Sequence, residues 1–303
     1  MKFYIYFLFL IHSFSLPIHA QEISTTHLIA TYTEAAKKGD ASAMFHLGVL
    51  YSDGVDGIKN YKNALYWYTE ASKKGNLEAI NNLGYMYENG FGMAKNNTLA
   101  EQYYQKAANA GFVPAQLNLG LFYEKDFSEI HSKKAFYWYT KAAEQGNKIA
   151  QNNLAKLYYF GMGTQQDLRL AFSWFQEAAW QDEPLAQYNL AMMYHLSEYV
   201  SADEEKMLFW LERSAENGSE HAQSKLGDLY AEGEGVAKDL HKAFSWYSKA
   251  AAQKFPKAMY QLGIFYFYGH SVPRDVIKAR EWLKKASDAG YEDASLFIDR
   301  NHL

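Results

Sequence analysis

The chain has 303 residues, with 30 Lys and Arg against 34 Asp and Glu and a formal net charge of -4. This balance gives no support to DNA or RNA binding, because phosphate binding needs concentrated Lys and Arg. Cysteine is absent, which excludes disulfides, a lipid anchor on Cys and soft-metal sites built on thiolates.

The first 20 residues read as a secretory signal peptide. Lys2 precedes an apolar run from Phe3 to Leu10, and Ala20 offers a small residue for cleavage before Gln21. The run is short for a membrane span and is followed by polar residues. We therefore expect an exported protein, periplasmic or secreted from a bacterium, without an integral membrane span after cleavage. Retention of the segment as an anchor is the alternative.

Residues 21–40 predict an N-terminal capping helix, after which one helical hairpin recurs seven times. The first helix of each copy shows Ala-x3-Leu-Gly/Ala-x2-Tyr, as in Ala222, Leu226, Gly227 and Tyr230. Successive copies begin 36 residues apart except for one interval of 35, a period typical of solenoid repeats. The predicted repeats are 41–75, 76–111, 112–146, 147–182, 183–218, 219–254 and 255–290, and residues 291–303 predict a C-terminal capping helix.

Two positions within the repeat indicate how the hairpin is built. A residue of the helix-capping type stands before most second helices, and we interpret these residues as N-caps and not as catalytic groups: Asn60, Asn96, Asp167, Asp203, Asp239 and Asp275. Glycine in the middle of a helix costs about 1 kcal/mol relative to Ala. The mid-helix glycines, such as Gly227, therefore predict close approach of the paired helices. The Trp of each second helix, such as Trp174, is expected in the core.

These residues resemble the Sel1-like repeat, a relative of the tetratricopeptide repeat. The sixth copy carries the motif at Leu226-Gly227, Gly233-Glu234-Gly235-Val236, Asp239, Lys242-Ala243 and Trp246-Tyr247. The resemblance covers residues 22–303 and implies an all-α, right-handed α-solenoid with capping helices at both ends. The copies depart from the motif at the terminal Gly, replaced by Asp182 and Lys254, and at residues 195–198 in place of the glycine loop. We expect those turns to be built differently.

The sequence contains none of the common catalytic or metal-binding patterns. It has no His pair at metal-ligand spacing beyond the signal, no Gly-x-Ser-x-Gly and no P-loop. Some Sel1-like proteins have been called penicillin-binding or weak β-lactamases, but no Ser-x-x-Lys occurs in this chain. We expect a protein that is not an enzyme and holds no metal or cofactor.

The resemblance implies that the first helices line a concave surface that receives a partner. One stripe of those helices is left free by the core positions and offers Asn amides and large aromatic side chains. The candidate partner-binding residues are Asn81, Tyr85, Asn152, Tyr159, Phe160, Tyr188, Tyr260 and Phe267. The alternative for each Tyr is that it merely covers the neighbouring helix.

We expect a monomeric adaptor or scaffold that binds a protein or an extended peptide, with bacterial host interaction as one setting. The alternative is a cell-envelope factor that recognises peptidoglycan peptides or assists a wall enzyme.

Overall fold

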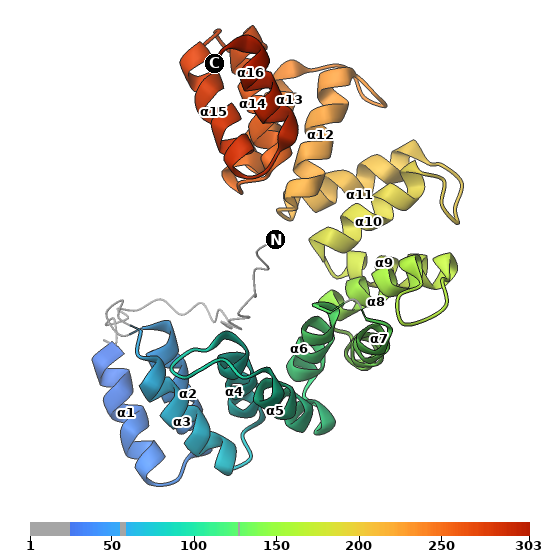
Figure 1. Ribbon diagram of the computed structural model, residues 1–303. Helices are drawn as coiled ribbons and strands as arrows, with labels where there is room; N and C mark the ends of the chain where they lie inside the picture. The colour runs from blue at the N-terminus through green and yellow to red at the C-terminus, as the bar shows by residue number, and fades with distance from the viewer. Residues whose placement is uncertain (1–24, 55–58, 127) are drawn as a thin grey trace, which may run out of the picture. The chain divides into compact units, whose positions relative to one another are not determined.

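The computed structural model describes residues 25–54, 59–126 and 128–303, and these residues form sixteen α-helices without a strand. The predicted signal peptide and the first residues of the predicted N-terminal cap lie outside the described residues. No helix in the described ranges is long and apolar enough to cross a membrane. The predicted all-α class and the predicted hairpin repeat are confirmed (Figure 1).

The helices alternate between the first and second members of the seven hairpins. A capping helix lies at each end: α1 (Thr25–Lys37) and α16 (Glu292–Asn301). The first helices are α2 (Ala41–Asp53), α4 (Leu77–Asn89), α6 (Val113–Glu124), α8 (Lys148–Phe160), α10 (Pro184–His195), α12 (Glu220–Glu232) and α14 (Pro256–Tyr268). The second helices are α3 (Tyr61–Lys73), α5 (Asn97–Asn109), α7 (Glu129–Glu144), α9 (Leu168–Trp180), α11 (Glu204–Glu216), α13 (Leu240–Ala252) and α15 (Val276–Asp288).

The chain divides into two compact units, with the boundary between Tyr103 and Tyr104 inside α5. Within each unit a helix packs mainly against the helices before and after it in sequence, as in a solenoid. Unit 1 has a core around Leu47, Tyr68 and Leu83, and unit 2 has separate clusters of buried residues, one around Leu190 and another around Leu262.

Three mid-helix glycines make room for an aromatic ring of the paired helix, and Gly263 makes room for Leu283, which confirms the predicted close approach. A Cβ on Gly227 would lie 2.5 Å from a ring carbon of Tyr247, and Gly48 and Gly120 stand equally close to Tyr68 and Tyr139. In these hairpins the most deeply buried aromatic side chain is therefore the residue that follows the Trp of the second helix. Trp174, predicted to be core, is only partly buried, while the ring of Phe175 is 3% exposed.

The predicted caps are confirmed. Asp167, Asp203, Asp239 and Asp275 each accept a hydrogen bond from a backbone N–H in the first turn of the helix that follows. Asn60 and Asn96 do the same for α3 and α5.

The expectation of different turns is wrong at two of the three departures from the motif. Asp182 and Lys254 adopt φ of 55° and 64°, the left-handed backbone that the terminal Gly adopts in the other repeats. The fifth copy does differ, because Ser197 and Tyr199 are the residues with positive φ in its interhelix loop.

Candidate functional site

Side-chain contacts join the first helices of unit 2 to one another, so that α6, α8, α10, α12 and α14 lie side by side. The contacts run from repeat to repeat: Lys156 with Glu124, Asn189 with Asn152, Tyr188 with His221, and Lys257 with Asp228. We call the surface formed by these side chains the first-helix face. This face corresponds to the part of the predicted stripe that lies in unit 2.

Two partly buried carboxylates lie on this face, each held by a tyrosine and a lysine. Tyr139 donates its hydroxyl to Glu124, and Tyr247 donates to Asp228 over 2.8 Å. Burial raises the pKa of both tyrosines, and the adjacent carboxylate raises it further. Both phenols therefore stay protonated donors across the physiological range.

Asn152 does not present its amide to solvent. It is 2% exposed, its Nδ2 donates to Asn153 over 3.3 Å, and its Oδ1 accepts from Asn189 over 3.0 Å. The interpretation of Asn152 as an open donor and acceptor for a partner backbone is thus corrected. Its amide links α8 to α10 because a buried polar group must find a partner within the protein.

The predicted aromatics of unit 2 differ in how far they are committed to internal contacts. Tyr159 donates to Glu198 over 2.6 Å, and this hydrogen bond, with burial, raises the pKa of Tyr159 to about 12. Tyr260 and Phe267 both pack against Phe297 of the capping helix α16. Phe160, in contrast, is 63% exposed.

Two predicted residues lie in unit 1, on α4. Asn81 is buried, whereas Tyr85 is half-buried. Tyr85 lines a cavity of about 150 Å³ in which the rings of Tyr61 and Phe91 stack 4.7 Å apart. The remaining lining residues are Ser52, Asp53, Lys59, Tyr68, Asn82 and Met86. Partner binding by Asn81 and Tyr85 stays a prediction.

An apolar strip follows the first-helix face of α10. Leu185, Tyr188, Met192 and Leu196 recur at spacings of three, four and four residues, which places them on one side of a helix. Leu185 is 42% exposed and Leu196 is 57% exposed, while Tyr188 and Met192 are partly buried. We call these four residues the α10 strip. Only Tyr188 was among the predicted site residues.

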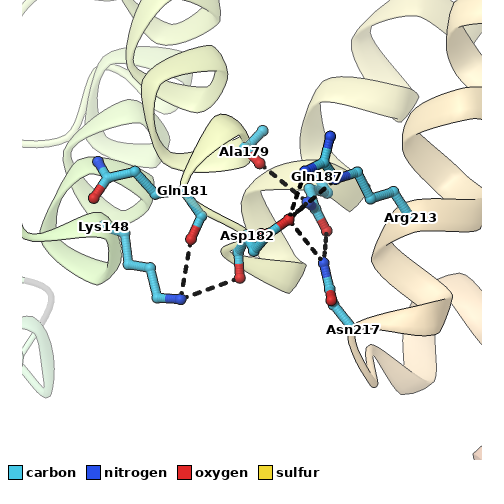
Figure 2. Close-up of polar contacts among 7 residues, drawn as sticks. All are labelled: Lys148, Ala179, Gln181, Asp182, Gln187, Arg213 and Asn217. Atoms are coloured by element: carbon cyan, nitrogen blue, oxygen red, sulfur yellow. Dashed lines mark hydrogen bonds and ion pairs between the residues drawn. The ribbon is translucent and has the colours of Figure 1, made fainter. Parts of the chain in front are cut away.

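Sequence reasoning missed a glutamine that ties four of the five repeats of unit 2 to the repeat before each of them. Gln187 is fully buried, donates to the carbonyl of Ala179 over 3.0 Å and accepts from Asn217 over 3.0 Å (Figure 2). The same double hydrogen bond recurs in three further repeats: Gln116 with Ala108 and Gln145, Gln151 with Ala143 and Gln181, and Gln223 with Ala215 and Gln253. The signal was a Gln four residues before the mid-helix Gly or Ala, paired with Gln or Asn at the end of the second helix.

The junction at Asp182 adds charge to this glutamine contact. Figure 2 shows the Asp182 carboxylate accepting from Arg213 over 3.0 Å and from Gln187 and Asn217. Lys148 donates to the backbone carbonyls of Gln181 and Asp182 on the other side. Burial raises the pKa of Asp182, but the hydrogen bond and charge of Arg213 and the hydrogen bonds from Asn217 and Gln187 together outweigh it, so the pKa is lowered. These contacts hold the left-handed turn in place.

Within the part of the chain that the structure describes, no three His, Asp or Glu side chains are grouped as metal ligands. The available chemistry on the first-helix face is hydrogen bonding, ion pairing and apolar burial. These are the means by which a surface binds another molecule.

Comparison with known proteins settles the family. The Sel1 repeat model matches residues 41–76, 77–112, 113–147, 148–182, 184–219, 220–255 and 256–291. The chain belongs to the Sel1 repeat family. Sel1 repeat solenoids generally mediate protein–protein interactions and are typically not enzymes.

Two solved structures are similar over most of this chain. A Sel1 repeat protein from Oxalobacter formigenes is 35% identical, with 90% of this chain and 79% of that chain covered and a TM-score of 0.75. A protective antigen present in uropathogenic Escherichia coli strains is 30% identical, with a TM-score of 0.73 and 89% of this chain covered. This chain spans 58% of that antigen's length. No curated protein matches the chain.

Proposed function

We propose that this Sel1 repeat protein is exported to the periplasm or the medium. There it acts as an adaptor or scaffold, and its first-helix face of unit 2 binds an extended segment of a partner protein. Family membership supports protein binding, and the signal-like residues 1–20 support export. The likeness to a protective antigen of uropathogenic Escherichia coli supports host interaction as the setting.

The α10 strip is the observation that carries this proposal. Its two outer leucines, Leu185 and Leu196, are exposed at opposite ends of one helix face, with Tyr188 and Met192 between them. Contiguous apolar surface of this kind marks an interaction site when polar groups flank it. Lys156 on α8 and Asp228 on α12 supply such groups on the two sides. A partner segment crossing α10 would bury the strip and meet polar side chains on both neighbours.

Binding of mature chain to an array of immobilised short peptides tests the proposed surface. The double variant Leu185→Asp/Leu196→Asp should lose most of the peptide signal, because a charge would have to be buried at each end of the strip. The matched control is Ile277→Asp on α15, which changes a side chain that is 75% exposed outside the first-helix face. Absence of any peptide signal, or equal loss in the control, would contradict the proposal.

The export half of the proposal has its own test. Intact-mass measurement of the protein from the periplasm or the medium should show a chain that begins at Gln21. A pool that retains Met1 to Ala20 would overturn export as a cleaved, released protein without affecting the binding proposal.

A further inference from the structure

One cluster on the first-helix face has more hydrogen-bond donors than it uses. On α12, His221, Ser224, Lys225 and Asp228 share one side of the helix, since they are spaced by three, one and three residues. Lys257 of α14 forms an ion pair with Asp228 over 2.5 Å. The charges of Lys257 and Asp228 both act on the hydroxyl of Tyr188 from α10, whose pKa is raised chiefly by burial. Three neighbouring repeats therefore converge here.

The acceptor side of this cluster is occupied. Oδ1 of Asp228 accepts from the Tyr247 hydroxyl over 2.8 Å, and Oδ2 accepts from Lys257. The side chain of Asp228 is only 13% exposed, so little of its carboxylate is left for a ligand. A partner cation would have to displace one of two internal hydrogen bonds.

Several hydrogen-bond donors of this cluster remain available to a ligand. Lys257 is 41% exposed and has further N–H groups beyond the one that meets Asp228. Among the described residues, the Tyr188 hydroxyl has no hydrogen-bond partner and Lys225 has no ion pair. The Ser224 hydroxyl is buried without a partner in the described chain. Such a hydroxyl is costly, since burial has removed it from water.

The charge balance indicates the kind of group that fits. Around the Tyr188 hydroxyl, Lys225 and Lys257 against Asp228 leave one positive charge in surplus. Two further carboxylates lie at the edge of the cluster, because Glu232 acts on the hydroxyl of Tyr247 and Asp293 acts, with Lys257 and Asp228, on that of Tyr291. Neither of them acts on the hydroxyl of Tyr188. A singly charged group that only accepts hydrogen bonds matches both the surplus and the open donors. A phosphate dianion would be repelled more strongly by the Asp228 carboxylate beside it.

We propose that Lys257, together with the hydroxyl of Tyr188 and the ammonium of Lys225, binds a carboxylate of the partner segment. The carboxylate comes from an Asp or Glu side chain or from the partner's C-terminus. This inference rests on the proposed function, because it assigns one contact of a peptide whose apolar residue covers the α10 strip. Tyr188 belongs to both the strip and the cluster, so the acidic group follows the apolar residue closely along the partner.

Peptide arrays test the inference with matched pairs of short peptides. In one arm each Asp and Glu is replaced by Asn and Gln, in a second arm the C-terminus is a carboxamide, and in a third arm Ser is replaced by phosphoserine. Wild type should bind the acidic member of a pair at least about tenfold better in the first or the second arm, since a hydrogen bond to a charged group contributes that much. The arm that responds identifies the source of the carboxylate.

Variants assign the effect to Lys257. Lys257→Gln should bind both members of each pair equally, and Lys257→Arg should keep the preference because it keeps the charge. Tyr188→Phe should weaken the preference without removing apolar binding. Lys206→Gln on α11 is the control, since Lys206 also pairs with an Asp but lies outside the first-helix face. Melting curves show whether each variant is folded.

The outcomes separate this inference from the proposed function. If peptides bind through the α10 strip with no preference for acid, or if Lys257→Gln and Lys257→Arg behave alike, the carboxylate site is wrong and the adaptor proposal stands. A preference for phosphoserine alone also overturns the carboxylate. If no peptide binds in any arm, both proposals fall.

Discussion

Two junctions of the first-helix face use the same three chemical groups and differ in what lies beside them. Each holds a tyrosine hydroxyl, a carboxylate and a lysine ammonium together: Tyr139, Glu124 and Lys156 at one junction, and Tyr247, Asp228 and Lys257 at the other. At the first, Asn152 is buried and bonded to Asn189. At the second, Ser224 has the repeat position of Asn152 but lies on the helix that bears the carboxylate, α12, and not on the helix that bears the lysine. Its buried hydroxyl is unbonded within the described chain.

The comparison shows that the repeat sets the arrangement of the helices, while the side chains at single positions decide what the surface can bind. The hairpin fixes the tyrosine, because Gly120 and Gly227 admit its ring, whereas the carboxylate stands four residues after Gly120 but one residue after Gly227. The residue three positions before the mid-helix residue also varies, and it is Asn152 before Ala155 and Ser224 before Gly227. The Asn152 amide is used in internal hydrogen bonds, whereas the buried Ser224 hydroxyl makes none.

The largest expected effect breaks what the two junctions share. Gly120→Leu and Gly227→Leu should each lower the free energy of unfolding by about 1 to 3 kcal/mol or more, because the new side chain would overlap a tyrosine ring. A Cβ at Gly227 already lies 2.5 Å from the Tyr247 ring. Chemical denaturation of the two variants measures the loss, and nearest-neighbour stability predicts that hydrogen exchange increases mainly in the affected hairpin.

A compensating pair provides the control for this first prediction. The fifth repeat carries Ala191 and Leu211 where the sixth carries Gly227 and Tyr247. The double variant Gly227→Ala/Tyr247→Leu should therefore be more stable than Gly227→Ala alone. Equal instability of the two would show that the tyrosine ring is not what the glycine accommodates.

The second prediction sharpens the difference between the junctions. Asn152→Ala should cost about 1 to 3 kcal/mol, because it leaves the partly buried amide of Asn189 without its acceptor. Ser224→Ala should be neutral or stabilising, since the hydroxyl that it removes has no partner among the described residues. Urea denaturation of both variants gives the comparison. A similar loss of unfolding free energy in both variants would show that the Ser224 hydroxyl, like the Asn152 amide, has a hydrogen-bond partner in solution.

The glutamine contacts recur in four repeats of unit 2, and removal of one should have an intermediate effect. Gln187→Leu keeps the size of the side chain but removes its hydrogen bond to the carbonyl of Ala179 and the acceptor that it offers to Asn217, at a cost of about 1 to 2 kcal/mol. In the seventh repeat the equivalent residue is Met259, which is 4% exposed and needs no such partner. Met259→Leu is therefore the matched control and should change the melting temperature much less.

The sequence was sufficient to predict the fold because the residues that determine the hairpin recur from copy to copy. A mid-helix Gly or Ala, a following aromatic and an Asp or Asn cap recur in register, so each copy supports the interpretation of the others. The turns at Asp182 and Lys254 were mispredicted because a non-Gly residue can be held at positive φ by its surroundings. Asp182, for instance, is bonded to Arg213.

The candidate site was predicted less well, because helical spacing gives the side of a helix and not the partner of a side chain. Asn152 lies on the predicted side, yet its amide is consumed by Asn189, a contact between residues 37 apart in sequence. Leu185 and Leu196 lie on the same side and were passed over in favour of aromatics, although they are more exposed than Tyr188. Exposure and hydrogen-bond partners depend on the neighbouring repeats, which spacing within one repeat does not describe.

The smallest expected effect is acid loosening of the second helices. Backbone N–H groups at the start of α13, foremost that of Lys242, lower the pKa of the capping carboxylate of Asp239. A carboxyl group whose pKa is lower in the native state than in the unfolded chain stabilises the fold above its ordinary value of about 4. That stabilisation is lost as the pH falls through the native value. The protection of α13 from hydrogen exchange, corrected for the intrinsic pH dependence of amide exchange, should therefore fall on acidification in the wild type but not in Asp239→Asn, which keeps a capping oxygen that does not titrate. The second helix of the third repeat, α7, provides the internal reference, because its cap is the hydroxyl of Ser128, although Asp126 accepts from the Ser128 N–H. If the wild type and Asp239→Asn respond alike to acid, the cap charge is not the group that titrates, and the other carboxylate at this hairpin, Asp228, becomes the next to replace.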